Sequence, residues 1–297
     1  MASPGARADS ALRGQVVASF GRRFLVELDG SVTVSCVARG RRRGIACGDN
    51  VRLTRISATE GVIEDIEPRT CLLYRSDEKR EKAIAANITQ VVVVVAIAPA
   101  PNAEFIDRCL AAAEHAGARS LLVLNKTDLD DPGEQASRIS ARYGALGYRT
   151  VPASMHSGIE HLLAELRGHL SVLIGQSGVG KSTLVNRLVP DANARVAGTS
   201  ATRDAGRHTT TRAQLYRIDA QSALVDSPGM HAFGLNHVDA ADLSHAFIEF
   251  RRFLGDCRFS NCRHDGEPGC AVDAAARDGR VLAERLASYR RILKTLA

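Results

Sequence analysis

The segment Gly175–Thr183 constrains the fold of this chain more than any other. It reads GQSGVGKST and matches the pattern G-x-x-x-x-G-K-[ST] in full, between an apolar run over residues 169–174 and an apolar helical stretch over residues 183–188. The glycines let the backbone turn its N–H groups inward at a helix N-terminus, where they can hold phosphate oxygens. The segment therefore predicts a nucleoside triphosphate cradled by Gly175, Gln176, Ser177, Gly178, Val179, Gly180, Lys181, Ser182 and Thr183, with Lys181 at the β- and γ-phosphates and the Ser182 hydroxyl on Mg²⁺.

Three other apolar runs are similar to the one before this loop. They cover residues 91–97, 120–124 and 222–225, and stretches of helical periodicity separate them, among them residues 105–115 and 159–166. Continuous apolar strands that alternate with helices are typical of a parallel sheet covered on both faces. Ligands of such sheets bind at the carboxyl ends of the strands, so we expect polar motifs at these ends to lie together.

One of these motifs selects the base. Asn125, Lys126, Thr127 and Asp128 follow the run over residues 120–124. The Asp128 carboxylate can accept two hydrogen bonds from the N–H groups of guanine, whereas adenine has no such pair of donors. We expect Asn125 to contact the purine and brace the phosphate loop, and the stem of Lys126 to lie across the ring. The motif thus favours GTP and GDP over adenine nucleotides.

A second motif, Asp226-Ser-Pro-Gly229, follows the run over residues 222–225 and fits D-x-x-G. We expect Asp226 to hold Mg²⁺ through water and the Gly229 N–H to sense the γ-phosphate. A threonine that contacts Mg²⁺ is expected in the stretch GRHTTT before this strand, and the sequence does not choose between Thr210 and Thr211.

The order of the motifs is unusual. In common GTPases the phosphate loop comes first and N-K-x-D comes late, yet here N-K-T-D at residue 125 precedes the loop at residue 175 and D-S-P-G comes last. This order predicts a circular permutation, which is compatible with an intact core because domain termini often lie close together. The D-x-x-G segment then leads directly into the C-terminal region.

The regions that flank the sheet differ from it. Five short segments rich in β-branched residues, over residues 15–66, predict a small β-barrel. The loop 39–43, RGRRR, is either a solvated turn or an RNA contact. We expect a disordered segment at 1–11, an OB-fold barrel at 12–68, the permuted nucleotide-binding domain at 69–240 and a mainly helical zinc domain at 241–297.

Four side chains near the end of the chain have metal-ligand spacing. They are Cys257, Cys262, His264 and Cys270, and three thiolates with one imidazole form the tetrahedral set of a structural zinc site. All four positions are filled by protein, which leaves no open position for catalysis. The remaining cysteines, Cys36, Cys47, Cys71 and Cys109, stand singly and are expected in the core.

Composition and charge are those of a globular protein, with 45% hydrophobic and 24% charged residues and a net charge of +6. Basic residues outnumber acidic ones by 11 to 8 in residues 1–70 and by 10 to 6 in residues 251–297. An excess of basic residues at the ends is consistent with contacts to a polyanion, and equally with solvated surfaces. The helical segment 271–297 is likewise either a solvated face or an RNA contact. Its basic positions are Arg280, Arg285, Arg290 and Arg291. A signal peptide and a membrane-spanning run are both lacking, so we expect a cytoplasmic protein with no membrane contact. We also expect it to be a monomer.

The motifs NKTD, GQSGVGKST, GRHTTT and DSPG, together with the cysteine cluster and the barrel, resemble the RsgA (YjeQ) family of circularly permuted GTPases over nearly the whole chain. The resemblance implies slow GTP hydrolysis stimulated by the small ribosomal subunit, a role in late maturation of that subunit, and docking of the barrel and zinc module on ribosomal RNA. It also implies that Ala153, in the loop 151–158, contacts the base through its backbone, although Pro152 stands where the family has serine.

The residue that positions the attacking water is not the usual one. Common GTPases use a glutamine directly after D-x-x-G, and here that residue is Met230. Polar candidates nearby are His208 and His231, and the resemblance favours His208 as catalytic. Two other functions stay open: an RNA-binding scaffold that senses guanine nucleotides with incidental hydrolysis, and a P-loop kinase or ATPase, against which Asp128 argues.

Overall fold

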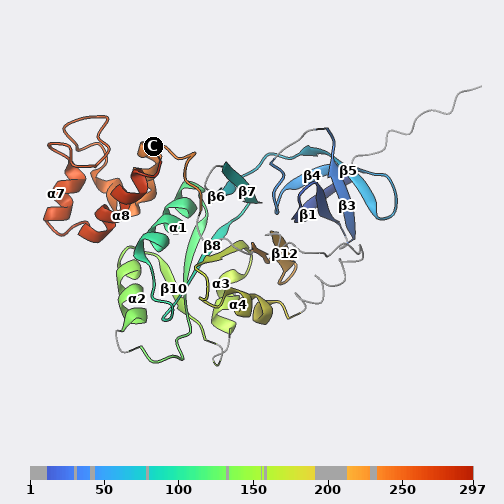
Figure 1. The fold of residues 1–297 in the computed structure, drawn as a ribbon, viewed down its shortest axis with the longest axis horizontal. Helices are drawn as coiled ribbons and strands as arrows, with labels where there is room; N and C mark the ends of the chain where they lie inside the picture. Colours follow the sequence, from blue (N-terminus) through green and yellow to red (C-terminus); the bar gives the residue numbers. More distant parts are fainter. Residues whose placement is uncertain are drawn as a thin grey trace, which may run out of the picture.

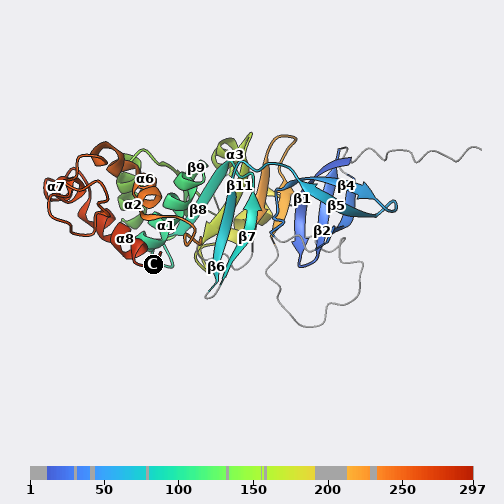
Figure 2. The same cartoon turned by 90° about the horizontal axis from the view of Figure 1, so that it is seen from above.

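A computed structural model of the chain describes residues 12–29, 32–40, 44–77, 80–131, 134–154, 156, 159–190, 213–227 and 233–296. Three modules follow one another along its long axis, with the N-terminal barrel at one end, the C-terminal helices at the other and an α/β domain between them (Figure 1). The view from above shows the same row (Figure 2). None of the helices in these residues is long and apolar enough to cross a bilayer.

The N-terminal module is a closed five-stranded barrel. Its strands are β1 (Leu12–Phe20), β2 (Arg23–Leu28), β3 (Thr33–Ala38), β4 (Asn50–Arg55) and β5 (Glu60–Ile66). They pair in the order β1-β2-β3-β5-β4, and β4 returns to β1. Alternate residues point inward, so Val16, Val26, Val34, Leu53 and Ile63 fill the interior. The predicted barrel is confirmed.

The central sheet carries the motifs. Its parallel strands lie in the order β10 (Arg149–Pro152), β9 (Arg119–Asn125), β8 (Gln90–Ala96), β11 (Leu170–Gly175) and β13 (Ala223–Asp226), and β12 (Gln214–Arg217) pairs antiparallel with β13. Strand β8 is buried along its whole length. Its side chains alternate between two cores, with Val91 and Val93 in one and Val92 and Val94 in the other.

Helices cover both faces of this sheet, as predicted. They are α1 (Ala103–His115), α2 (Gln135–Ala145), α3 (Glu160–Leu166) and α4 (Lys181–Leu188). Leu110 of α1 packs on one face, whereas Leu162 of α3 and Leu184 of α4 pack on the other. The first turn of α1 is capped by Asn102, whose side-chain oxygen accepts from the Phe105 N–H at 3.1 Å.

A hairpin lies between the barrel and the sheet where the charged composition indicates only a connector. It consists of β6 (Leu72–Asp77) and β7 (Arg80–Ala86). One edge pairs with the barrel module, since the Ala86 N–H donates to the Cys47 carbonyl at 2.8 Å. The other edge pairs with the segment after residue 232, because the Gly234 N–H donates to the Tyr74 carbonyl at 2.9 Å. The hairpin therefore joins the barrel to the chain that leaves the D-x-x-G motif.

A second junction joins the barrel directly to the sheet. Strand β1 pairs antiparallel with β12, with Ala18 opposite Gln214, so the strands form one eleven-stranded sheet. The guanidinium of Arg217 on β12 binds the Glu27 carboxylate at 2.7 Å and the Gln15 side-chain oxygen at 2.8 Å. Both neighbours belong to barrel strands.

The C-terminal module consists of α6 (Ala240–Ala246), the 3-10 helix η1 (Ile248–Phe253), α7 (Ala271–Arg277) and α8 (Ala283–Leu293). It packs on α1 through a core that includes Phe247, Phe250 and Tyr289. Arg285 of α8 is 1% exposed and binds Asp107 of α1 and Glu249 of η1, each at 2.7 Å. Arg285 is thus a buried link between modules, and its interpretation as an RNA-contacting position is wrong.

Candidate functional site

The nucleotide motifs meet at the carboxyl edge of the central sheet. Asn125 ends β9, Ala153 follows β10, Gly175 ends β11 and Asp226 ends β13. These strands lie in one parallel set, with β8 between β9 and β11. Segments far apart in the chain therefore face the same space, as the strand pattern predicts.

The phosphate loop lies between β11 and α4. Gly180 has a φ of +93°, and a Cβ on it would lie 2.4 Å from the side-chain nitrogen of Asn125. A Cβ on Gly175 would lie 2.4 Å from the Val94 carbonyl oxygen. Val179 is buried and anchors the loop, whereas Ser177, Gly178 and Ser182 are exposed. Only glycine fits at residues 175 and 180, so the loop backbone itself forms the surface that a phosphate would meet.

Lys181 and Asp226 face this loop from α4 and β13. The ammonium of Lys181 donates to the carbonyls of Gly175 at 2.6 Å and Gln176 at 2.8 Å. Burial lowers the pKa of Lys181, an effect that the charge of Asp226 opposes. Burial likewise raises the pKa of Asp226, and Lys181 opposes that shift. Both charged groups are held partly out of water, which is consistent with a site that a triphosphate and a divalent cation would complete.

The guanine motif braces the phosphate loop. The Asn125 side-chain amide donates to the Val179 carbonyl at 2.8 Å. Lys126 donates through its ammonium to the Ala98 carbonyl at 2.6 Å. The bracing by Asn125 is present as expected.

Ala153 lies against the same motif. Its carbonyl accepts from the backbone N–H of Thr127 at 3.2 Å and from the Thr127 hydroxyl at 3.1 Å. The Ala153 N–H donates to the Leu124 carbonyl at 2.8 Å, which continues the pairing of β10 with β9. The Asp128 carboxylate lies 3.8 Å from the His156 imidazole, a residue of the same loop as Ala153. The structure thus brings Asp128 and Ala153 to one end of the site.

Arg187 also helps to hold the site together, although it belongs to none of the predicted motifs. It lies on α4 and donates to the carbonyl of Ser154, one residue beyond Ala153. The helix that begins at the phosphate loop is therefore bonded to the loop beside the guanine motif. Its sequence signal is weak, because an arginine on the outer face of a helix usually contacts solvent.

Several predicted site residues lie outside the described residues. They are His208, Thr210, Thr211, Gly229, Met230 and His231, and the same holds for Arg41, Arg42 and Arg43 of the basic loop. Their expected roles stay predictions. Arg39, at the start of that loop, binds Glu64 at 2.8 Å.

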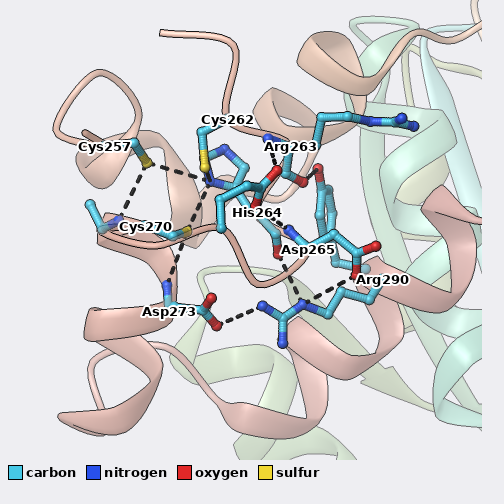
Figure 3. Close-up of polar contacts among 11 residues, drawn as sticks. Cys257, Cys262, Arg263, His264, Asp265, Cys270, Asp273 and Arg290 are labelled. Carbon is cyan, nitrogen blue, oxygen red and sulfur yellow. Dashed lines mark hydrogen bonds and ion pairs between the residues drawn. The ribbon is translucent and has the colours of Figure 1, made fainter. Parts of the chain in front are cut away.

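The four predicted metal ligands converge in the C-terminal module (Figure 3). The Nδ1 atom of His264 lies 3.6 Å from the sulfurs of Cys257 and Cys262 and 3.4 Å from that of Cys270. A tetrahedral zinc ion with Zn–S near 2.3 Å and Zn–N near 2.0 Å separates nitrogen and sulfur ligands by about 3.5 Å. All four ligand atoms lie within 4.8 Å of one another. Donor chemistry and spacing both fit Zn²⁺.

Surrounding groups hold these ligands in place. The N–H groups of Ala271 and Asp273 donate to the sulfurs of Cys257 and Cys270 at 3.3 and 3.4 Å. Arg290 donates to the His264 carbonyl at 2.9 Å and to the Asp273 carboxylate at 2.6 Å (Figure 3). Such outer contacts orient metal ligands. Burial raises the pKa of the Cys262 thiol to about 12, so deprotonation of this thiol calls for a bound cation.

The other cysteines behave as packing residues. Cys36, Cys47 and Cys109 are buried, and Cys71 is partly buried. Burial raises the pKa of Cys36 to about 11 and those of Cys47 and Cys109 further. Thiols of this kind stay protonated and unreactive.

Known proteins share this architecture. The family profile described as RsgA GTPase matches residues 66–236. The chain is 48% identical over 285 residues to a protein of Nitrosospira multiformis named Small ribosomal subunit biogenesis GTPase RsgA, covering 96% of this chain and 91% of that protein. The crystal structure of YjeQ from Thermotoga maritima is 31% identical with a TM-score of 0.74, covering 96% of this chain and 98% of that one. The structure of YloQ, described as a circularly permuted GTPase, has the same fold, with a TM-score of 0.71. The two sequences are 22% identical, and the match covers 99% of this chain and 98% of YloQ.

Proposed function

The chain belongs to the RsgA GTPase family, and from this premise we propose that it acts in the biogenesis of the small ribosomal subunit, where the subunit stimulates its hydrolysis of GTP. The observation that carries the GTPase assignment is the bond between Asn125 and Val179, which joins the guanine motif to the phosphate loop at one sheet edge. The basic terminal modules support a ribosomal RNA partner. A cytoplasmic site of action follows from this partner.

In this proposal the guanine motif with Ala153 binds the base of GTP, and the phosphate loop with Lys181 binds its phosphates. Asp128 and the Ala153 backbone bind guanine, Asn125 braces the loop, and the loop N–H groups bind the phosphates. Lys181 turns from the carbonyls of Gly175 and Gln176 to the β- and γ-phosphates, which restores a charged partner to its buried ammonium. The full set is Asn125, Lys126, Thr127, Asp128, Ala153, Gly175 to Thr183, Thr210, Thr211, Asp226 and Gly229.

Two metal ions complete the protein. Ser182 would hold Mg²⁺ directly and Asp226 through water, and this ion would neutralise charge on the phosphates. Cys257, Cys262, His264 and Cys270 would hold a structural Zn²⁺. The proposed zinc ion has no open position and so takes no part in the chemistry.

His208 is the proposed catalytic residue that orients the attacking water, since Met230 has no group that can do so. The test is subunit-stimulated turnover by a His208→Ala variant, with His231→Ala as the matched control. We expect the first variant to lose stimulated turnover while it still binds GTP, and the second to retain it. Full turnover by His208→Ala would remove the assignment.

The connections support a coupling between nucleotide state and the flanking modules. Asp226 ends β13, which pairs with β12, and β12 pairs with the barrel strand β1. Beyond the D-x-x-G motif the chain pairs with hairpin β6–β7, which also pairs with the barrel at Cys47. We propose that GTP sets how the barrel and zinc modules grip the subunit, and that hydrolysis releases it.

One assay separates this function from the scaffold alternative. GTP turnover by the zinc-loaded full chain is measured alone, with purified small subunits, and with large subunits as the matched control. We expect small subunits to raise turnover at least about 10-fold and large subunits to leave it unchanged. Equal turnover in all three conditions would favour a scaffold with incidental hydrolysis.

A further inference from the structure

One aromatic side chain in this protein faces solvent. The chain has eight Phe, five Tyr and no Trp. All thirteen lie in the described residues, and only Phe259, at 44%, is exposed. Isolated apolar side chains on a surface are common. Phe259 differs from them in how it is held and in what surrounds it.

The backbone around Phe259 is fixed at several points. The side chain lies on the loop between the metal ligands Cys257 and Cys262. The Cys262 N–H donates to the Phe259 carbonyl at 3.2 Å, and the Arg258 N–H donates to the Gly269 carbonyl at 3.0 Å. A Cβ on Gly269 would lie 2.8 Å from the Arg258 Cβ, so the two sides of the loop touch. The ring is therefore presented to solvent on a rigid support, which lowers the entropy cost of binding a flat partner.

The residues that neighbour Phe259 along the chain are charged or polar. The Arg258 guanidinium lies 5.5 Å from the ring centroid, within the range of a cation–π contact. The other neighbours in the loop, Ser260 and Asn261, are exposed and polar, as is Arg263 beyond Cys262. A protein hot spot is usually surrounded by further apolar contacts that exclude water, and such residues do not flank Phe259 in this loop. A lone aromatic ring beside a cation and next to hydrogen-bonding residues is instead typical of a platform for single-stranded nucleic acid.

We propose that Phe259 stacks against an unpaired nucleobase of RNA, with Arg258 beside it on the neighbouring phosphate. This inference rests on the proposed function and adds to it a specific contact and a preference for an unpaired base. Stacking recognises the face that every base has, so the site requires an accessible base rather than a particular sequence. RNA in a continuous duplex does not offer such a face.

The absence of tryptophan allows a direct test. A Phe259→Trp variant of the zinc-loaded full chain contains a single tryptophan, whose fluorescence is quenched when a base stacks on it. The matched control is Leu282→Trp, because Leu282 is 43% exposed in the same module and lies outside the metal loop. The probe is a mixed-sequence single-stranded RNA of about 10 nucleotides, and the same RNA in duplex form. We expect the single strand alone to quench the Phe259→Trp variant, and neither RNA to quench the control. Equal quenching of both variants, or quenching by the duplex alone, would overturn the proposal.

Affinity gives a second readout. Phe259→Ala and Phe259→Leu are each expected to weaken binding of the single strand about 10-fold, because one stacked base is lost in both. Their zinc content reports whether the module has folded. Retention of full affinity by Phe259→Leu would indicate an apolar protein-like contact and would contradict stacking.

The two experiments separate this inference from the proposed function. If small subunits stimulate turnover but RNA does not quench the Phe259→Trp variant, this inference fails alone. If quenching occurs without stimulation, the proposed function fails alone.

Discussion

The side-chain amide of Asn125 donates a 2.8 Å hydrogen bond to the backbone carbonyl of Val179, across 54 residues of chain. The bond ties the end of β9 to the loop before α4 and lies beside the tight approach of Gly180. The two motifs keep this relationship although their order is the reverse of that in common GTPases. A circular permutation therefore changes the connections between strands while the geometry of the sheet edge is retained.

Base specificity is the first consequence that can be tested. Asp128→Asn replaces one of two acceptor oxygens by a donor amide, which opposes the donor on guanine and matches the carbonyl on xanthine. We expect GTP affinity to fall at least about 100-fold and xanthosine triphosphate affinity to rise. Equilibrium binding of both nucleotides measures the exchange. An unchanged preference for GTP would show that Asp128 does not contact the base.

We expect the Asp226 carboxylate to lower the stability of the nucleotide-free protein, although Mg²⁺-dependent turnover needs it. Burial raises its pKa above the ordinary value of an aspartate, so folding of the nucleotide-free protein penalises the ionised form. The ionised carboxylate therefore costs stability as pH rises through this raised pKa. Asp226→Asn should raise the Tm of the nucleotide-free protein by about 2 °C at neutral pH, and this advantage should vanish below the ordinary pKa of an aspartate. The same variant should lose Mg²⁺-dependent turnover. A lower Tm at neutral pH would contradict the expected sign.

The buried charges of Arg285, Asp107 and Glu249 predict a large loss on truncation. Arg285→Ala leaves two carboxylates without their cation and should cost about 3–5 kcal/mol in the free energy of unfolding. The matched control is Arg291→Ala on the same helix, which breaks an exposed pair with Glu104 of α1 and should cost less than about 1 kcal/mol. Calorimetry of both variants provides the comparison. Equal small losses would show that the buried contacts do not hold the modules together.

Zinc removal tests the metal centre. Cys262→Ser should lose stoichiometric zinc and lower the Tm of the C-terminal module, because metal binding and folding are coupled. The control Cys36→Ser changes a buried thiol of the barrel and should keep its zinc. Burial places the metal-free pKa of Cys262 at about 12, so protons compete with the metal and zinc affinity should rise with pH. Metal analysis that finds equal zinc in both variants would refute the ligand assignment.

The sequence predicts the elements whose signal is local. The run over residues 91–97 indicates a strand buried on both faces, and β8 is such a strand. Motif spacing likewise predicts the convergence of Cys257, Cys262, His264 and Cys270, because ligands so close in the chain meet without long-range packing.

Elements that depend on distant partners could not be predicted in this way. Hairpin β6–β7 is charged along much of its length, and its pairing with Cys47 and Gly234 appears only in the folded chain. Arg285 has the sequence pattern of a solvated helical position. Its partner Asp107 lies 178 residues earlier, so no local pattern indicates the buried contact. Helix α2 is capped from an unusual position: the Asp131 carboxylate accepts from the N–H groups of Gln135 and Ala136, each at 2.9 Å, whereas Glu134 at the N-cap position makes no capping bond. The usual N-cap pattern therefore does not mark the start of this helix.

The central claim is that the bound nucleotide sets the grip of the flanking modules on the small subunit. It is tested most directly by the affinity of the zinc-loaded full chain for purified small subunits, measured in a non-hydrolysable GTP analogue and in GDP. We predict binding at least about 10-fold tighter with the analogue. Equal affinity in the two nucleotides would contradict the coupling through β12 and hairpin β6–β7.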